Sequence, residues 1–181
     1  MKKVEHGKTF DRNAANPPAF EIFHNTVTEG YPEHWHNAIE IIMPTRGEYE
    51  VVVGKDSYNL KEGDIIMINS GVVHGMRFVS QGERIVMLVE PGCVENQEEM
   101  ETIFLRLPAI YFKKEDEEDP FYLFLRSQIL ELVREYDNEG AVMTHRICTG
   151  LKELFSEFGR KGFSDANAQN TFGAMKQQEY I

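Results

Sequence analysis

The sequence predicts a mostly β fold, an antiparallel barrel or sandwich, followed by an antiparallel pair of helices. From about residue 19 to residue 91, short apolar or alternating runs are separated by turn residues at intervals of about eight to twelve positions. After Pro91, apolar residues recur at helical spacing instead. The runs that we expect to form strands are Glu21–Thr28, Ala38–Met43, Glu48–Val53, Asp64–Asn69, Gly75–Phe78 and Arg84–Val89.

Glycines separate most of these runs, at positions where tight turns need a positive φ. They are Gly47, Gly54, Gly63, Gly71 and Gly82. Many short strands joined by close turns favour antiparallel pairing, and the apolar run DIIMIN suits the centre of a sheet.

Two amphipathic helices are expected in the second part of the chain. Asp119 is typical of an N-cap and Pro120 of a first helical position. The apolar residues that follow lie on one face of a helix over Phe121–Tyr136, and a second stripe indicates a helix over Met143–Phe158. A turn at 138–140 separates the two helices.

These patterns divide the chain into three segments. Residues 1–112 are expected to form the barrel, with a short helix over Asn96–Leu105, and residues 113–161 the helical pair. Residues 162–181 begin with a polar stretch rich in Gly, Ser, Asp and Asn. We interpret this last segment as a linker and the start of a further domain that this chain does not contain.

The charge of the chain excludes several classes of partner. The formal net charge is −11, with acidic clusters at Glu95–Glu101 and Glu115–Asp119. A surface of this sign repels phosphate backbones, so the chain is not expected to hold DNA or RNA by itself. No apolar run approaches the ~20 residues of a membrane span, and no basic amphipathic face is present for a membrane surface.

The chain has two cysteines, Cys93 and Cys148. They are too few and too far apart in the sequence to indicate a disulfide scaffold or a thiolate zinc site. The N-terminal lysines are not followed by an apolar stretch, so no secretory signal is indicated. We therefore expect a reduced, cytoplasmic protein.

Three histidines and one glutamate have the spacing of a metal-binding set. His34 and His36 share one face of an extended strand. Glu40 would lie roughly 13 Å beyond His36 on a straight strand, so the chain must turn at residues 37–38 for Glu40 to approach the histidines. His74 must come from another strand, after the turn at Gly71. Such a set suits one divalent transition metal, Zn, Ni, Fe, Mn or Cu, and the sequence does not distinguish among them.

These residues carry a resemblance to the cupins. His34-x-His36-x3-Glu40-x6-Gly47 resembles the first cupin motif, and the residues from Gly63 to His74 resemble the second. The resemblance implies a cupin barrel, that is, a double-stranded β-helix or jelly roll. Three positions depart from the family pattern: Thr28 replaces a glycine, Asn69 a proline and Phe78 an asparagine.

The layout of the whole chain resembles the sensor half of AraC-type transcription regulators. In that family a cupin barrel and a helical pair precede two helix-turn-helix units, which are absent from this chain. The resemblance implies that a small effector, a sugar or an organic acid, enters the barrel. It also implies a homodimer formed through the 121–158 helices, and DNA contacts made only by a C-terminal domain outside this chain.

Residues that share a strand face with the ligand set are candidates for the effector pocket. Counting from Glu40 gives Ile42 and Arg46, counting from His74 gives Met76 and Phe78, and His24 lies on a first-strand candidate. Each has an alternative: core packing for Ile42, Met76 and Phe78, and an exposed position for Arg46 and His24. Trp35, of opposite parity to His34 and His36, is expected in the core or at the rim.

Two other functions stay open. One is a small metal-dependent cupin enzyme, such as a dioxygenase, isomerase or lyase, in which the metal acts as a Lewis acid or activates oxygen. The other is a metal-free binding protein, in which the same four side chains form a polar network. We expect no catalytic residue, because no dedicated general acid or base accompanies the ligand set.

Overall fold

The computed structural model describes residues 19–26, 30–93, 108–114, 118–138 and 140–161. Nine strands and two long helices are found in these ranges. The strands are β1 (Phe20–Asn25), β2 (Tyr31–His34), β3 (Ile39–Arg46), β4 (Tyr49–Val53), β5 (Asp56–Leu60), β6 (Ile65–Ile68), β7 (His74–Phe78), β8 (Glu83–Val89) and β9 (Ala109–Phe112). The helical elements are the 3-10 turn η1 (Pro91–Cys93) and the α-helices α2 (Pro120–Asp137) and α3 (Met143–Lys161).

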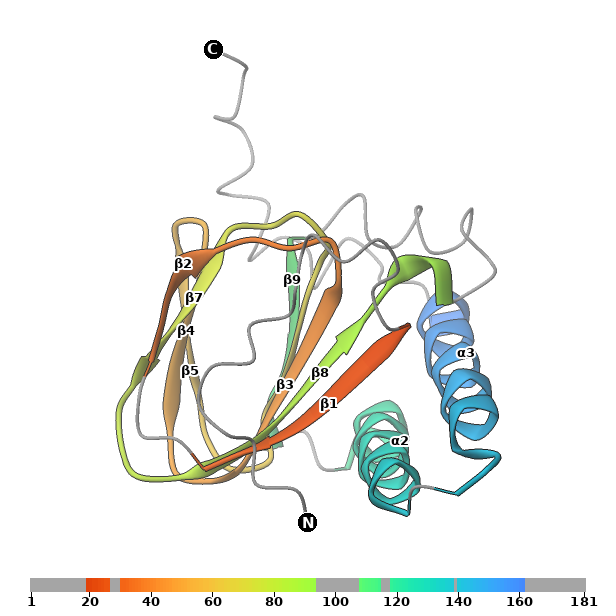
Figure 1. Ribbon diagram of the computed structural model, residues 1–181. Coiled ribbons are helices and arrows are strands. Elements are labelled where there is room, and N and C mark those ends of the chain that lie inside the picture. Colours follow the sequence, from red (N-terminus) through yellow and green to blue (C-terminus); the bar gives the residue numbers. More distant parts are fainter. Residues whose placement is uncertain (1–18, 27–29, 94–107, 115–117, 139, 162–181) are drawn as a thin grey trace.

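The strands form two antiparallel sheets that face each other (Figure 1). One sheet has the strand order β1-β8-β3-β6-β9 and the other β2-β7-β4-β5. Between them lies an apolar cluster that includes Ile42, Val51, Ile66 and Met76. The cupin fold expected from the sequence, a β-sandwich followed by two helices, is confirmed.

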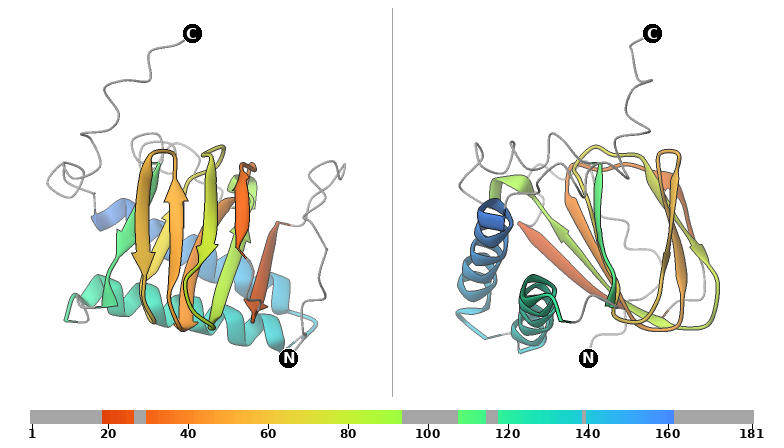
Figure 2. Two further views of the ribbon diagram at one scale, coloured as in Figure 1. Left: turned by 90° about the vertical axis from the view of Figure 1, so that its left-hand side faces the viewer. Right: turned by 180° about the vertical axis from the view of Figure 1, so that it is seen from behind.

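The two helices cover the outer face of the five-stranded sheet, on the side away from the four-stranded sheet (Figure 2). Side chains alternate along each strand, so β3 directs Ile39 and Ile41 toward the helices and Glu40 and Ile42 toward the other sheet. The buried residues on the helix side form the larger apolar cluster, to which α3 contributes Leu151 and other residues. This layered arrangement gives the five-stranded sheet two buried faces.

The start of α2 follows the signals in the sequence. The Asp119 carboxylate accepts a hydrogen bond from the backbone N–H of Phe121 at 2.8 Å, and Pro120 occupies the first turn. Tyr122 then anchors the helix to the barrel, because its hydroxyl donates to the carbonyl oxygen of Gly63 at 2.8 Å. The predicted helices over 121–136 and 143–158 are therefore confirmed, each with a slightly longer extent.

Three strands lie outside the six predicted runs, and each lacks the alternating apolar signal. The extended strand expected to carry both His34 and His36 ends at His34 in the structure. β2 reads YPEH and β5 reads DSYNL, so both are largely polar, and β2 and β5 are the two edges of the four-stranded sheet. β9 is a four-residue strand at the edge of the five-stranded sheet. Edge strands bury fewer side chains than central strands, which weakens their pattern.

Some expectations fall on other parts of the chain. The helix expected over Asn96–Leu105 and the linker expected over 162–181 lie outside the described residues. Within the described residues, neither helix has the length and apolar character required to cross a membrane.

Candidate metal centre

The four predicted ligands are brought together by a crossing between the two sheets. β2 ends at His34, the chain bends at residues 37–38, and β3 begins at Ile39 in the opposite sheet. The turn that we inferred is therefore present, although it joins two sheets rather than neighbouring strands. His74 is the first residue of β7 and lies directly opposite His34 in the β2–β7 pair.

The turn before β7 ties the two halves of the site to each other. Gly71 has a positive φ of 76°, which a residue with a Cβ adopts only at a cost. In this conformation its backbone N–H donates to the carbonyl oxygen of His36 at 2.8 Å. A single backbone hydrogen bond thus fixes the first histidine segment against the loop that delivers His74.

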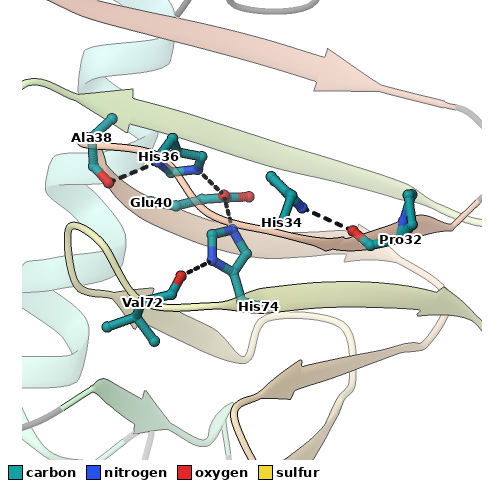
Figure 3. Close-up of polar contacts among 7 residues, drawn as sticks. All are labelled: Pro32, His34, His36, Ala38, Glu40, Val72 and His74. Atoms are coloured by element: carbon teal, nitrogen blue, oxygen red, sulfur yellow. Dashed lines mark hydrogen bonds and ion pairs between the residues drawn. The ribbon is translucent and has the colours of Figure 1, made fainter. Parts of the chain in front are cut away.

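The ligand atoms of His34, His36, Glu40 and His74 all lie within 4.8 Å of one another. Glu40 Oε2 is 2.9 Å from His36 Nε2 and 2.9 Å from His74 Nε2 (Figure 3). The His34 ring completes the group, with its centroid 4.5 Å from that of His74. His36, Glu40 and His74 are buried, and His34 is half-buried.

Each histidine is oriented by a backbone carbonyl (Figure 3). His34 Nδ1 is 2.9 Å from the oxygen of Pro32, His36 Nδ1 is 2.9 Å from that of Ala38, and His74 Nδ1 is 2.8 Å from that of Val72. Because a carbonyl oxygen only accepts, every Nδ1 carries the proton and donates it. The lone pair of each neutral ring is then on Nε2, the atom that His36 and His74 direct at Glu40.

This arrangement leaves the centre in need of a cation. A carboxylate oxygen and a neutral Nε2 are both acceptors, so two contacts of 2.9 Å require either extra protons on the rings or a metal ion between the atoms. Two ligands at about 2.1 Å from an ion, at a right angle to each other, are separated by about 3.0 Å. The two Glu40–histidine distances match this separation, so the residues fit an octahedral divalent metal.

The electrostatics favour the charge states that bind metal. Burial acts to raise the pKa of Glu40, but hydrogen bonds from His36 and His74, which form when the rings carry the extra protons of the metal-free state, outweigh it and lower the pKa to about 2. Burial lowers the pKa of His34, with the neighbouring histidines acting in the same direction. At neutral pH the centre therefore presents a carboxylate and a neutral His34.

The structure divides the predicted pocket residues into two groups. Ile42 and Met76 lie in the apolar cluster between the sheets, as expected for an interior wall. Arg46 is exposed and His24 lies on the helix-covered face of its sheet, whereas Phe78 shares the strand face of Met76 but is partly exposed at the end of β7.

Arg46, Phe78 and His24 differ in their surroundings. Arg46 is at the end of β3, its side chain is 61% exposed, and it pairs with Glu83 at 3.3 Å. Phe78 ends β7 and is 38% exposed, where it lines an open hollow together with Tyr31. His24 lies opposite Ile85 in the β1–β8 pair and so shares the face that the helices cover. Trp35, at 56% exposure, lies at the surface rather than in the core.

One interior residue was missed. Arg84 in β8 is 1% exposed and has the parity of Val86 and Leu88, whose side chains form a third buried cluster with Ala38. Its guanidinium carbon lies 4.8 Å from the ring centroid of Tyr49 and 5.7 Å from that of Tyr31. Such positions stabilise a cation through the faces of the rings. Arg84 begins the apolar run that was predicted as a strand, but nothing in the run shows that the arginine itself is buried.

Residues 25–90 match the family model of the cupin domain. No curated protein matches the chain in sequence. Among solved structures, apo ToxT from Vibrio cholerae, crystallised as a point variant, is similar over 92% of this chain and 61% of that chain, with 11% identity and a TM-score of 0.53.

Two further structures match a smaller part. SPY1581, a conserved protein of unknown function from Streptococcus pyogenes, is similar over 40% of this chain and 63% of that chain, with 18% identity and a TM-score of 0.36. Oxalate decarboxylase from Bacillus subtilis, a protein with Mn(II) centres, is similar over 41% of this chain and 22% of that chain, with 20% identity and a TM-score of 0.35. This chain spans less than two thirds of the length of each of the three structures. At these identities, the likeness to ToxT shows a shared fold of barrel and helices and nothing more.

Proposed function

We propose that this chain is the effector-binding and dimerisation domain of a transcription regulator, and that its cupin site holds one divalent metal. The observation that carries the proposal is the combination of a buried centre of three histidines and one glutamate with a helical pair packed on the opposite face of the same sheet. The likeness to ToxT, an AraC-family regulator, supports it because it extends over the helices as well as the barrel. The DNA-reading part belongs to a domain outside this chain.

The metal would be held by Nε2 of His34, His36 and His74 and by a carboxylate oxygen of Glu40. Once bound, it offers Lewis acidity at any coordination position that the protein leaves open. The carbonyl oxygens of Pro32, Ala38 and Val72 keep the rings in the tautomer that binds. The histidine rings therefore already have the orientation needed to hold the metal before an oxygen atom of the effector approaches it.

We infer that the effector is a small molecule, a sugar or an organic acid, and Arg84 is the residue that would favour an acid. Arg84 places a buried guanidinium on the interior face of the sheet that also carries Glu40. Guanidinium groups bind carboxylates through two parallel hydrogen bonds, and Arg is the residue preferred for this task in buried sites. Such an acid would share Arg84 with the rings of Tyr49 and Tyr31, which its guanidinium already contacts.

Dimerisation is assigned to the exposed face of α2. Leu123 is 50% exposed and Leu130 is 38% exposed, and a separation of seven residues places both on one side of the helix. Together they form an apolar surface turned away from the barrel. A second copy of the chain would cover it.

Metal loading and an effector screen test the proposal. The chain is purified without chelator or nickel resin, and its metal content is measured by elemental analysis. Organic acids and sugars are then screened by thermal shift, where a ligand of the folded state raises the melting temperature. A melting temperature that rises selectively with one organic acid, which is afterwards recovered chemically unchanged, supports the regulator function.

The same centre also suits a second candidate, a small metal-dependent cupin enzyme, since three histidines and one glutamate with open positions form a catalytic arrangement as well as a sensory one. Chemical analysis of the screened ligands separates the two functions. If the metal-loaded chain converts any ligand to a product, the result supports the enzyme and contradicts the regulator.

A further inference from the structure

The two cysteines of the chain lie against each other, although 55 positions separate them in the sequence. The Sγ atoms of Cys93 and Cys148 are 3.4 Å apart. Cys93 is the last residue of η1, which follows β8, and Cys148 lies in the second turn of α3. The sequence alone indicated no relation between them, because nothing in the spacing shows that α3 returns to the end of β8.

The surroundings of the pair make it a contact between the barrel and the helices. Both cysteines are half-buried and pack against the apolar cluster between the five-stranded sheet and the helices. Cys148 lies two residues before Gly150, where α3 approaches α2 so closely that an added Cβ would lie 2.8 Å from Leu132 Cδ2. A bond at Cys148 would therefore act on α3 at the point where it packs on α2.

We propose that Cys93 and Cys148 form an intramolecular disulfide when the protein meets a peroxide, and that this bond fixes the helical pair to the barrel. A disulfide brings two sulfurs to about 2.05 Å, so the Sγ atoms need to approach by about 1.4 Å. Rotation about the Cα–Cβ bonds of the two cysteines moves their sulfurs on this scale.

The reaction balances with one equivalent of hydrogen peroxide. One sulfur attacks an oxygen of the peroxide, the O–O bond breaks, and a sulfenic acid and one water are formed. The second sulfur attacks the sulfenic sulfur, the S–S bond forms, and a second water leaves. The two thiols lose two electrons and two protons, and the peroxide is reduced to two waters.

The surroundings of Cys93 assign the two sulfurs different roles in this reaction. Burial raises the pKa of Cys93 to about 12, and the hydrogen bond and charge of Cys148 act in the same direction. Thiolate is then scarce at Cys93 at neutral pH, which slows its attack on any oxidant, peroxide included, so Cys148 is the sulfur that would attack the peroxide and Cys93 the one that would close the disulfide. Lys152, one turn beyond Cys148, acts in the opposite direction.

Thiol labelling tests the proposal on the full chain. The reduced protein is treated either with hydrogen peroxide or with diamide, an azodicarboxamide that accepts two electrons and two protons from a pair of thiols. It is then alkylated, digested and analysed by mass spectrometry. We expect both thiols to become protected together, the intact mass to fall by about 2 Da after diamide, and a peptide to be found that links Cys93 to Cys148.

The melting temperature provides a second readout. Closing a loop of this length is expected to raise it by about 5–10 °C after diamide, and dithiothreitol should reverse the rise. The variants Cys93→Ser and Cys148→Ser should show no rise, and the double variant reports any effect of diamide on the rest of the chain. Full alkylation of both thiols in treated, folded protein would overturn the proposal, as would disulfide-linked dimers in place of the internal bond.

Discussion

Replacing Glu40 by glutamine should weaken both the folded state and the binding of metal. The substitution keeps the size of the side chain and removes the charge that His36 and His74 contact at 2.9 Å. The magnitude follows from the pKa of Glu40, which is lowered from 4.5 to about 2 in the fully buried site. With 1.36 kcal/mol per unit, the carboxylate contributes on the order of 3 kcal/mol to the folding free energy of the metal-free protein.

The pH dependence of this contribution has a definite sign. Because the pKa of Glu40 is lower in the folded than in the unfolded chain, the stabilisation is complete above pH 4.5. It is lost as the pH falls from about 4.5 toward 2, where the folded protein also takes up the proton. At pH 7 the Glu40→Gln variant should therefore melt about 6–12 °C below the parent chain.

Thermal unfolding with and without metal provides the assay. Circular dichroism is followed in EDTA at pH 7 and at pH 3, and metal affinity is measured by calorimetry with Mn(II), Zn(II) and Ni(II). We expect the difference in melting temperature to shrink at pH 3, and the metal affinity of the variant to fall by a factor of ten or more.

Glu50→Gln is the matched control. Glu50 also accepts hydrogen bonds, from Ser57 at 2.6 Å and Arg77 at 3.2 Å, but it takes no part in the centre and these bonds are exposed. Its replacement should change the melting temperature little. The reasoning is refuted if Glu40→Gln melts like the parent chain in EDTA, or if it binds metal with unchanged affinity.

Three further outcomes are expected. Metal affinity, measured by calorimetry, should fall as the pH is lowered from 7.5 to 5.5, because histidine ligands must lose a proton to bind. Burial lowers the pKa of His34, so this ligand should take up a proton only at a lower pH than an unperturbed histidine does. Arg84→Gln should weaken an organic acid found in the screen by about 10–100-fold while leaving the binding of neutral ligands unchanged, as judged by calorimetry. The double change Leu123→Glu and Leu130→Glu should convert a dimer to a monomer in sedimentation, with an unaltered melting temperature of the barrel; a dimer that survives it would assign the contact to another surface.

The barrel and its metal ligands were predictable because their signals are local. A strand buried on one or both faces has an apolar pattern that can be read directly, as in DIIMIN, and α2 begins at a cap that two residues specify. The spacing of His34, His36 and Glu40 required a bend between them, and the bend is present at residues 37–38. In each case the constraint acts within a few residues of chain.

The parts that could not be predicted depend on which face a strand turns toward its neighbours. Arg46 was counted by parity from Glu40 and His24 was placed on a candidate first strand, yet β1 directs His24 at the helices and the end of β3 leaves Arg46 in solvent. Arg84 was overlooked because arginine is rarely buried, so composition alone argues for the surface. The contact between Cys93 and Cys148 needs the path of α3, which no local pattern contains.

The alternation along β3 links the candidate metal centre to the helices. Glu40 contacts His36 and His74 on one face of the strand, while Ile39 and Ile41, the residues on either side, pack in the cluster that holds α2 and α3. Interiors of this density do not deform smoothly, so a shift of Glu40 is felt by both isoleucines. We propose that an effector or metal that moves Glu40 would change the packing of the helical pair through the neighbouring residues Ile39 and Ile41. A sensor needs such a connection, and an enzyme of the same fold does not.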